Sequence, residues 1–274
     1  MFTLNCKGRL LTINKPVVMG ILNINPDSFF SHSRFTRHED ILSAAAKMIK
    51  EGAAILDIGG QSTRPGSQRV PAAEELQRVI PAIELIHKNF PDTIISIDTY
   101  YSLVAKAAVT AGASIINDIS AGTIDADLLD TVALLQVPYI LMHIQGTPET
   151  MQQKPVYENV VREVLDFFIK KTEILRAKGI KDIIIDPGFG FGKTTGQNFQ
   201  LIEDLSVFKI LCLPILLGVS RKGSIYKTLE TDAENALNGT TVLNTIGLLN
   251  GTHILRVHDV KEAAEAIKLV SYFI

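Results

Sequence analysis

The sequence predicts an α/β fold, a (β/α)8 TIM barrel with a short N-terminal β-hairpin, formed as a single domain over residues 1–274. Three observations carry this prediction. Eight short apolar segments suited to buried parallel strands follow one another along the chain, and each is followed by a stretch typical of loop and helix. The length of 274 residues lies slightly above the roughly 250 typical of such barrels. Because the carboxyl ends of all eight strands share one face, where barrel enzymes carry their active sites, strand-end residues are the first candidates for function.

The eight expected strands read VMGILN, AAILD, IISID, SIIND, YILMH, DIIID, PILLGVSRK and HILRVH. Nearly every one ends in a residue able to bind phosphate, metal or a heterocycle. In chain order these residues are Asn23, Asp57, Asp98, Asn117 with Asp118, His143, Asp186, Ser220 with Arg221 and Lys222, and Arg256 with His258. The pattern predicts a site that handles an anion and a flat polar ligand.

Composition and charge exclude several other classes of protein. The hydrophobic content of 46% supports a large core, and a net charge of −2 is too small to favour nucleic acid or a membrane surface as a partner. No apolar run approaches the roughly 18 residues of a membrane span, and the N-terminus lacks a signal pattern. We therefore expect a cytoplasmic protein. Two cysteines cannot form a disulfide framework, and Cys212, in the apolar run LCLPILLGV, is predicted to be a small core residue.

The positions of glycine and the spacing of apolar residues predict where turns and helices lie. The segment FTLNCKGRLLTI alternates around Lys7 and Gly8, which predicts a hairpin that plugs the bottom of the barrel. An apolar stripe at helical spacing predicts a helix over 157–175, and Gly179 ends it before the next strand. The same joint of helix, glycine and strand recurs in EGAAILD, AGASIIND and NGTHILRV.

One helical pattern, over residues 72–90, contains Pro81. An interior proline costs roughly 3 kcal/mol, so we expect a kink there or two abutting helices. The longest irregular segments follow strand ends, where barrels carry their working loops: 24–38, 59–71, 143–156 and 187–197.

Several strand-end residues permit both a functional and a structural interpretation. The amide oxygen of Asn23 suits Mg²⁺, although Asn23 could equally cap its turn. Arg64, in a glycine-rich loop, offers a bidentate fork for an anion, although that loop could be a simple turn. Asp98 and Asn117 can bind the donor–acceptor edge of a pterin or purine, or either could be a helix N-cap.

The later strand ends are more specific. Asp186 ends an apolar strand and precedes three glycines that alternate with Phe189 and Phe191. A carboxylate matches the amino-pyrimidinone edge of a pterin, and an aromatic ring can stack on a flat substrate, although Phe189 could be core.

Charged residues mark the last two strand ends. Arg221 and Lys222 place two cations at the barrel mouth, which requires an anionic or carbonyl partner. Arg256 and His258 lie two residues apart on the last strand, and we interpret them as a phosphate clamp across the barrel from Asn23.

Taken together, these segments resemble the dihydropteroate synthase family over essentially the whole chain. The resemblance rests on GILNINPDSFF, DIGGQSTRPGS, SIDTY, IINDIS, LMHIQGTPETMQ, DPGFGFGKT, GVSRKG and ILRVHDVKEA. It implies a transferase of folate biosynthesis that condenses 6-hydroxymethyl-7,8-dihydropterin diphosphate with p-aminobenzoate and releases diphosphate. It also implies sulfonamide as an inhibitor class, Mg²⁺ as cofactor and a homodimer.

The resemblance further implies roles for individual residues. Asp98, Asn117, Asp186 and Lys222 would hold the pterin, with Met142 against its ring. Asn23 would ligate Mg²⁺, and Arg256 and His258 would hold the diphosphate. The p-aminobenzoate pocket would comprise Thr63, Arg64, Pro65, Phe191, Lys222 and Ser224. The residues expected to act in catalysis are Asp98, Asp186, Lys222, Arg256 and His258, in a dissociative substitution that requires no covalent nucleophile.

Two departures and two alternatives accompany this resemblance. Asn25 stands where the family usually has threonine, and Gln61 where it usually has glutamate. A methyltetrahydrofolate-binding methyltransferase domain would share the strand-end Asp and Asn residues, but it has no need of Arg256 and His258. A non-catalytic pterin-binding subunit is the alternative from outside the enzymes.

Overall fold

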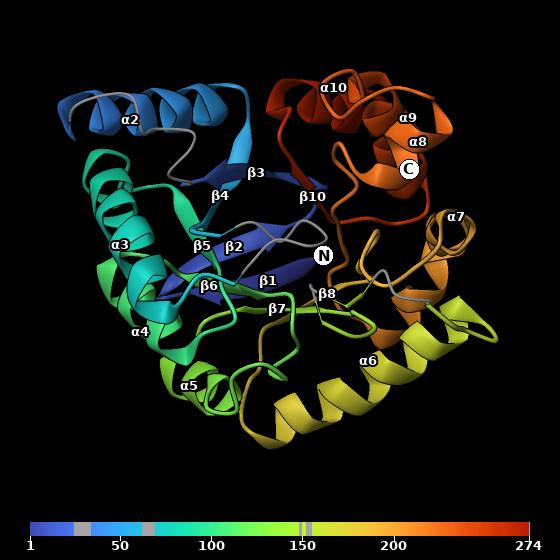
Figure 1. Ribbon diagram of the computed structural model, residues 1–274, viewed down its shortest axis with the longest axis horizontal. Helices are drawn as coiled ribbons and strands as arrows, with labels where there is room; N and C mark the ends of the chain where they lie inside the picture. The colour runs from blue at the N-terminus through green and yellow to red at the C-terminus, as the bar shows by residue number, and fades with distance from the viewer. Residues whose placement is uncertain (25–33, 62–68, 148–149, 152–154, 274) are drawn as a thin grey trace.

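A closed ring of parallel strands surrounded by helices forms the body of the molecule (Figure 1). The computed structural model describes residues 1–24, 34–61, 69–147, 150–151 and 155–273. Its barrel strands are β3 (Val17–Asn23), β4 (Ala53–Gly59), β5 (Ile94–Asp98), β6 (Ile115–Asp118), β7 (Tyr139–Met142), β8 (Ile183–Asp186), β9 (Leu216–Leu217) and β10 (Ile254–Val257). The eightfold barrel expected from the sequence is confirmed.

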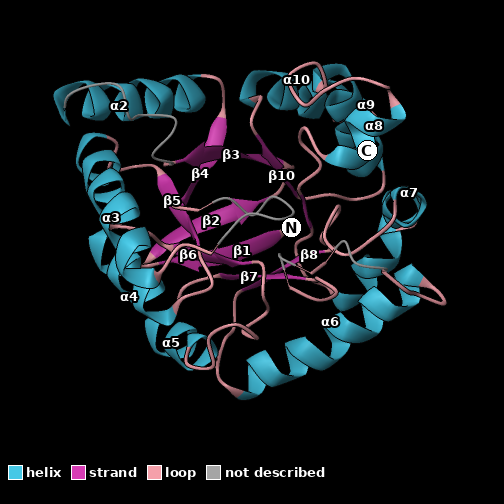
Figure 2. Cartoon of the chain, viewed as in Figure 1, coloured by secondary structure: helices cyan, strands magenta, loops and turns pink. Residues whose placement is uncertain are grey.

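The helices lie outside the ring of strands, as Figure 2 shows in cyan around magenta. They are α2 (Arg34–Lys50), α3 (Ala72–Asn89), α4 (Ser102–Ala111), α5 (Leu128–Leu135), α6 (Val160–Ala177), α7 (Thr195–Glu203), the 3-10 helix η1 (Leu205–Leu211), α8 (Gly223–Thr228), α9 (Leu237–Leu249) and α10 (Val260–Val270). The main apolar core fills the layer between the strands and these helices.

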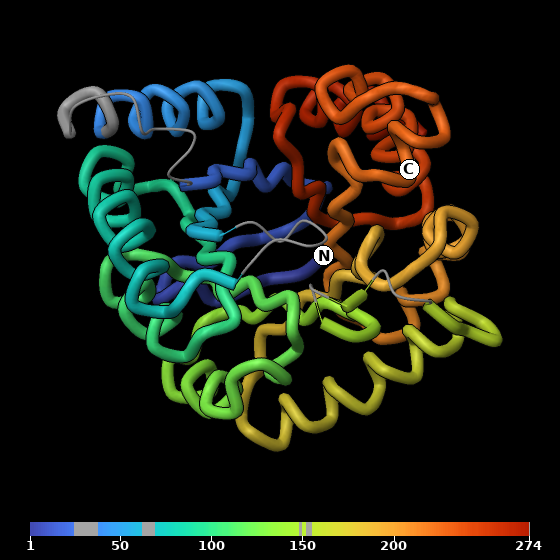
Figure 3. Tube along the Cα trace, in the orientation of Figure 1, coloured from blue at the N-terminus to red at the C-terminus, as the bar shows by residue number. Residues whose placement is uncertain are grey.

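The order of strands decides which side chains meet at the mouth. The sheet runs β8-β7-β6-β5-β4-β3-β10-β9, and every pairing in it is parallel. A bridge between Ile185 and Ile215 connects the two outer strands and closes the ring. The first and last barrel strands, β3 and β10, are therefore neighbours, and the blue and red parts of the trace lie side by side (Figure 3).

The N-terminal hairpin closes one end of the barrel. Strands β1 (Phe2–Cys6) and β2 (Arg9–Ile13) pair antiparallel around Lys7 and Gly8. Their inward side chains, among them Leu4 and Cys6, share an apolar cluster with residues from the amino-terminal halves of the barrel strands. The hairpin is thus the plug that the sequence predicted, and it leaves the opposite face for chemistry.

The environment of Cys212 corrects an expectation. Cys212 is exposed, at the end of η1, with a left-handed φ of +53°. The apolar run around it begins as a helix end at the surface and enters the core only from Leu213 onward. Hydrophobicity alone could not distinguish that turn from a strand.

Pro81 lies inside one continuous helix, α3, so the alternative of two abutting helices is wrong. The face of α3 that carries Val79, Ile83 and Ile86 is fully buried against the barrel. Burying each such side chain contributes about 1.5–3 kcal/mol, which together offsets the roughly 3 kcal/mol penalty of the proline.

The helix–glycine–strand joints are confirmed. The predicted helix over 157–175 occurs as α6, whose N-cap Asn159 accepts a hydrogen bond from Arg162 N. Gly179 after it has a φ of +85°. The glycines of the three similar joints, Gly52, Gly112 and Gly251, also have positive φ.

The joints at Gly112 and Gly179 predict different responses to one methyl group. A Cβ at Gly112 would lie 2.5 Å from His87 Cγ, whereas one at Gly179 would meet nothing within 4 Å. We expect Gly179→Ala to lower the free energy of unfolding by about 1–2 kcal/mol through backbone strain alone. Gly112→Ala should lower the free energy of unfolding by roughly 1–3 kcal/mol more, because the added methyl group overpacks against His87. Urea unfolding of the two variants measures the difference, and equal losses would show that the close approach of His87 carries no weight.

Candidate active site

Five charged or polar side chains converge where the strands end, on the face away from the hairpin. Asp57, Asp98, Asn117 and Asp186 come from β4, β5, β6 and β8, and Arg256 comes from β10. Register places Asp98 beside Asn117 on neighbouring strands. The predicted convergence of the acid Asp98 and the amide Asn117 is confirmed.

Arg256 joins two of the carboxylates. Its Nε donates to Asp57 Oδ2 at 2.6 Å, and its Nη2 donates to Asp98 Oδ2 at 2.6 Å. Asn117 Nδ2 donates to the same Asp57 oxygen at 3.1 Å. The guanidinium expected to clamp a phosphate is therefore already ion-paired at two of its five N–H donors, so a phosphate contact would use the others.

Asp57 is the site residue that sequence reasoning undervalued. It is 0% exposed, accepts hydrogen bonds from Arg256 and Asn117, and its Oδ1 has no partner. The signal was present, because Asp57 follows an apolar strand as Asp98 and Asp186 do.

Burial sets the protonation chemistry of this face. It raises the pKa of Asp98 to about 7, with Arg256 opposing the shift, and it raises the pKa of Asp186, with Lys222 opposing it. Burial lowers the pKa of Lys222 to about 7, against the pull of Asp186. For Arg256, burial is outweighed by Asp57 and Asp98, which raise its pKa and keep it charged. The mouth thus pairs a permanent cation with groups that exchange protons near neutrality.

An apolar wall adjoins the charged groups. Met142, Phe191, Tyr100, Ile119 and Met151 form one buried cluster at this end of the barrel. The face can therefore offer an aromatic and thioether surface beside acceptors, which suits a flat heterocycle with polar edges.

Lys222 and Asp186 connect this wall to the charged groups. Lys222 Nζ lies 4.3 Å from the centre of the Phe191 ring and donates to the carbonyl of Phe189. Asp186 Oδ1 accepts a hydrogen bond from Gly188 N at 2.8 Å. Phe189 itself is core, as the structural interpretation had it.

The two cations of the segment GVSRKGS have different partners. Arg221 forms a bidentate pair with Asp259, at 2.9 and 2.7 Å, whereas Lys222 turns to Phe189 and Phe191. Each cation has the anionic or carbonyl partner that the sequence required, namely Asp259 for Arg221 and the carbonyl of Phe189 for Lys222. The backbone of Arg221 is left-handed, with a φ of +55°.

His258 and Asn23 are exposed at the ends of two adjacent strands, β10 and β3, rather than facing each other across the barrel. This corrects the expected arrangement. His258 Nδ1 lies 3.0 Å from Ser220 Oγ, which also accepts from His258 N. Both residues can reach one ligand at the β3–β10 edge of the face.

Ser224 is buried in the first turn of α8, where its hydroxyl accepts a hydrogen bond from Asn198. Its expected contact with substrate stays a prediction. Thr63, Arg64 and Pro65 lie outside the described residues, as does Asn25. Gln61 is described and buried; its amide donates to Glu75 and accepts from Tyr100.

The position of Asn23 suits a magnesium ion that takes most of its ligands from phosphate oxygens of the substrate and from water. Within the described ranges, no group of three or more His, Cys, Asp or Glu side chains could hold a metal. Asp57 and Asp98 are engaged by Arg256, which leaves the exposed amide oxygen of Asn23 as a hard ligand. Mg²⁺ commonly takes one or two protein ligands and completes its shell with water and phosphate oxygens.

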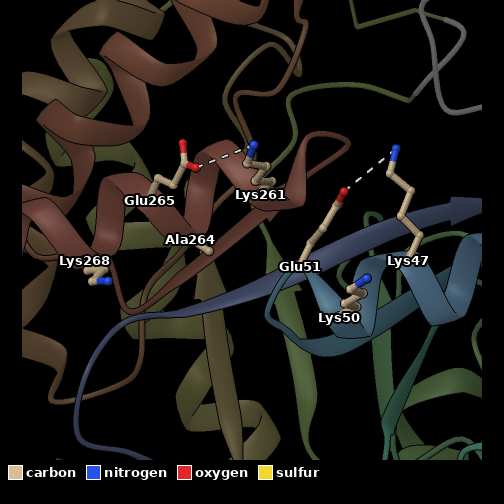
Figure 4. Close-up of a pocket in the computed structure, with 7 residues that line it drawn as sticks. All are labelled: Lys47, Lys50, Glu51, Lys261, Ala264, Glu265 and Lys268. Atoms are coloured by element: carbon tan, nitrogen blue, oxygen red, sulfur yellow. Dashed lines mark ion pairs between the residues drawn. The ribbon is translucent and has the colours of Figure 1, made fainter.

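A hollow lies between α2 and α10 on the outer wall of the barrel (Figure 4). It is lined by Lys47, Lys50, Glu51, Lys261, Ala264, Glu265 and Lys268. Lys47 pairs with Glu51 and Lys261 with Glu265, in exposed i,i+4 pairs of little energetic weight. None of these residues ends a barrel strand, so the carboxyl face remains the candidate site.

Comparison with known proteins identifies the family of the chain. The chain matches the family described as "Pterin binding enzyme" over residues 19–258. It is 41% identical to the dihydropteroate synthase of Escherichia coli K12 over 96% of this chain and 94% of that protein. A crystal structure of Yersinia pestis dihydropteroate synthase with a sulfonamide drug complex superposes with a TM-score of 0.93, at 38% identity over 99% of both chains. The Xanthomonas albilineans dihydropteroate synthase in complex with 7,8-dihydropteroate gives a TM-score of 0.88, at 37% identity over 99% of this chain and 98% of that one.

The family match over residues 19–258 and the relatives that are dihydropteroate synthases make this barrel a pterin-binding enzyme of the transferase class. Within that class, identity over nearly the full length of both chains decides the family. The chain belongs to the dihydropteroate synthase family.

The lowered pKa of Lys222 predicts a pH-dependent contribution to stability. Between about 7 and the ordinary 10.5, the folded chain has released a proton that the unfolded chain still holds, so this group's contribution to stability rises with pH in that window. Lys222→Met removes the contribution. Because Lys222 is only half-buried, solvent screening limits the expected effect to about 1 kcal/mol.

Urea unfolding of both proteins at about pH 6 and about pH 9 tests this prediction. The variant should be more stable relative to wild type at the lower pH. A difference between the two proteins that is the same at both pH values, or of the opposite sign, would contradict the shift.

Proposed function

We propose that this chain is a dihydropteroate synthase that transfers a pterinylmethyl group to p-aminobenzoate. The substrates are 6-hydroxymethyl-7,8-dihydropterin diphosphate and p-aminobenzoate, and the products are diphosphate and 7,8-dihydropteroate. The observation that carries the proposal is the set of buried acceptors Asp98, Asn117 and Asp186 around one mouth. The likeness to the Xanthomonas albilineans enzyme in complex with 7,8-dihydropteroate supports it.

The buried carboxylates suit the pterin. An amino-pyrimidinone edge presents parallel N–H donors, and a carboxylate accepts two such bonds with charge assistance. Asp186 Oδ1 accepts one bond from Gly188 N and keeps a second lone pair, so both carboxylate oxygens can accept from the ligand. Met142 and Phe191 supply the apolar surface against which the ring lies.

The β3–β10 edge suits the diphosphate. We expect His258 and the remaining N–H groups of Arg256 to bind its oxygens, with Mg²⁺ at Asn23. The metal ion, when bound, supplies Lewis-acid neutralisation of the charge that the leaving group gains. His258 is oriented for this by Ser220.

A dissociative substitution follows from these groups. Diphosphate leaves with the electron pair of the broken C–O bond, and the positive charge spreads into the pterin ring between Asp98 and Asp186. The amine of p-aminobenzoate then attacks the methylene carbon and loses a proton. Preorganised charges aimed at developing charge supply the acceleration, without a covalent nucleophile. Thr63, Arg64, Pro65, Phe191, Lys222 and Ser224 remain the proposed p-aminobenzoate pocket.

The proposed setting is a cytoplasmic homodimer acting on small molecules. Among the described residues, no helix is long and apolar enough to cross a membrane.

The experiment that tests the proposal measures diphosphate released by the purified chain with and without p-aminobenzoate. Release that requires p-aminobenzoate and matches 7,8-dihydropteroate formed is the expected result. A methyltetrahydrofolate-binding methyltransferase domain or a non-catalytic pterin-binding subunit would release no diphosphate. Absence of release would therefore refute the proposal.

Asp186→Asn should weaken binding of a pterin analogue by about 2–4 kcal/mol. If the Asn oxygen keeps the bond to Gly188 N, its amide group points donors at the donors of the ligand. Calorimetry measures the loss. Asp182→Asn is the matched control, since Asp182 lies before the same strand and bonds the hairpin at Asn5 N. Near-native affinity in Asp186→Asn would show that this carboxylate does not bind the pterin.

Sulfonamides should compete with p-aminobenzoate, because the Yersinia pestis relative carries such a drug and Phe191 and Lys222 are placed together here. Steady-state rates over a range of both compounds measure this. Inhibition should fall as p-aminobenzoate rises. Inhibition that stays constant would place the drug elsewhere.

A further inference from the structure

A buried lysine joins the two loops that carry the pterin-side residues. Lys193 is 3% exposed, in the loop between β8 and α7. Its Nζ donates to three backbone carbonyls: Phe191 O at 2.9 Å, Gly188 O at 3.0 Å and His143 O at 3.3 Å. An ammonium group has three donors, and here each has an acceptor.

The loop is built tightly around this ammonium group. Gly188 has a φ of +68°, and a Cβ there would lie 1.9 Å from His143 O, so only glycine lets the two backbones meet. Gly192 also packs closely against Gln145, where a Cβ would lie 2.5 Å from Gln145 O. The carbonyls that surround Nζ therefore belong to two loops pressed together, and buried carbonyls without a donor would each be unfavourable.

The contacts of Lys193 reach the candidate site through the backbone. Gly188 offers its carbonyl to Lys193 and its N–H to Asp186 Oδ1. Phe191 offers its carbonyl to Lys193, while its ring lies under Lys222 Nζ. His143 N bonds Asp186 O, which connects the third carbonyl to the same strand end. Lys193 thus bonds the carbonyls of three residues, Gly188, Phe191 and His143, two of which bond Asp186 through their N–H groups.

We propose that Lys193 is a positioning residue, an internal cation whose carbonyl cradle fixes the loop carrying Asp186 and Phe191 for pterin binding. It makes no hydrogen bond to a carboxylate within the described residues, and its three bonds resemble the carbonyl coordination of a bound monovalent cation. Burial lowers the pKa of Lys193 to about 7, and the attraction of Asp186 opposes this shift. An effect of Lys193 on turnover rests on the proposed function. An effect of Lys193 on pterin affinity does not.

Chemical rescue tests this role. Lys193→Ala removes the atoms of propylammonium and leaves the cradle. Because small displacements of binding groups cost up to about a hundredfold, we expect pterin-analogue affinity to fall roughly tenfold or more. Propylammonium chloride should restore most of it, and 1-propanol, of similar shape but uncharged, should not. Lys193→Met should bind as weakly as Lys193→Ala but gain nothing from propylammonium, because the methionine side chain fills the space.

Each comparison has a control. All titrations are run where circular dichroism shows the variant folded, so that global stability does not enter. Lys170→Ala, at an exposed position of α6, is the matched lysine loss and should change neither affinity nor its response to propylammonium. Wild-type affinity in Lys193→Ala, or equal rescue by 1-propanol, would overturn the proposal. So would a Lys193→Ala chain that stays unfolded even with propylammonium, since Lys193 would then be required for the fold itself.

The outcome is separable from that of the proposed reaction. Diphosphate release by the wild-type chain is measured alongside the titrations. If the wild type releases none with p-aminobenzoate, the proposed reaction fails, while the pterin titrations still decide the role of Lys193.

Discussion

The buried guanidinium of Arg256 is the interaction on which the candidate site depends. It lies between Asp57 and Asp98, two carboxylates that end neighbouring strands, and bonds both at 2.6 Å. Two buried carboxylates that share one guanidinium would repel one another without it. A buried pair of this kind contributes little net stability, but breaking it by removing one partner is expensive. The pairing instead fixes geometry, because Arg256 on β10 reaches past β3 to Asp57 on β4 and Asp98 on β5.

The rest of the mouth is arranged around that fixed charge. Asn117 bonds the Asp57 oxygen that Arg256 also uses, so the amide next to Asp98 is held by the same group. Across the ring, Asp186 and Lys222 form the other charged side, supported from beneath by the backbone loop around Lys193. The hairpin seals the opposite end with apolar side chains, which confines the charges to one face. A flat ligand placed there would have fixed donors and acceptors at its edges.

The sequence predicted the parts of the site that depend on local pattern. Apolar runs located the strand ends, and parallel strands brought Asp98, Asn117 and Asp186 to one face. It did not predict pairings between distant side chains: Asp57 and Arg256 are 199 residues apart, and nothing local marks either as the partner of the other. Strand order, which no periodicity encodes, made neighbours of Asn23 and His258. The sequence also did not show that Arg221 would pair with Asp259 while the neighbouring Lys222 bonds the carbonyl of Phe189.

The central claim is that the Arg256 pairs hold ionised carboxylates in place, and the stability of Arg256→Met as a function of pH tests it most directly. The account predicts a loss of about 3–5 kcal/mol in the free energy of unfolding above neutral pH, where Asp57 and Asp98 would be buried without the guanidinium that pairs with both. Burial raises the pKa of Asp98 to about 7 although Arg256 opposes the shift, so in the variant the pKa lies higher still. Asp98 of the variant is therefore protonated and neutral below about pH 7, and the loss should shrink there. A loss of equal size at both ends of this range, or none at all, would contradict the account.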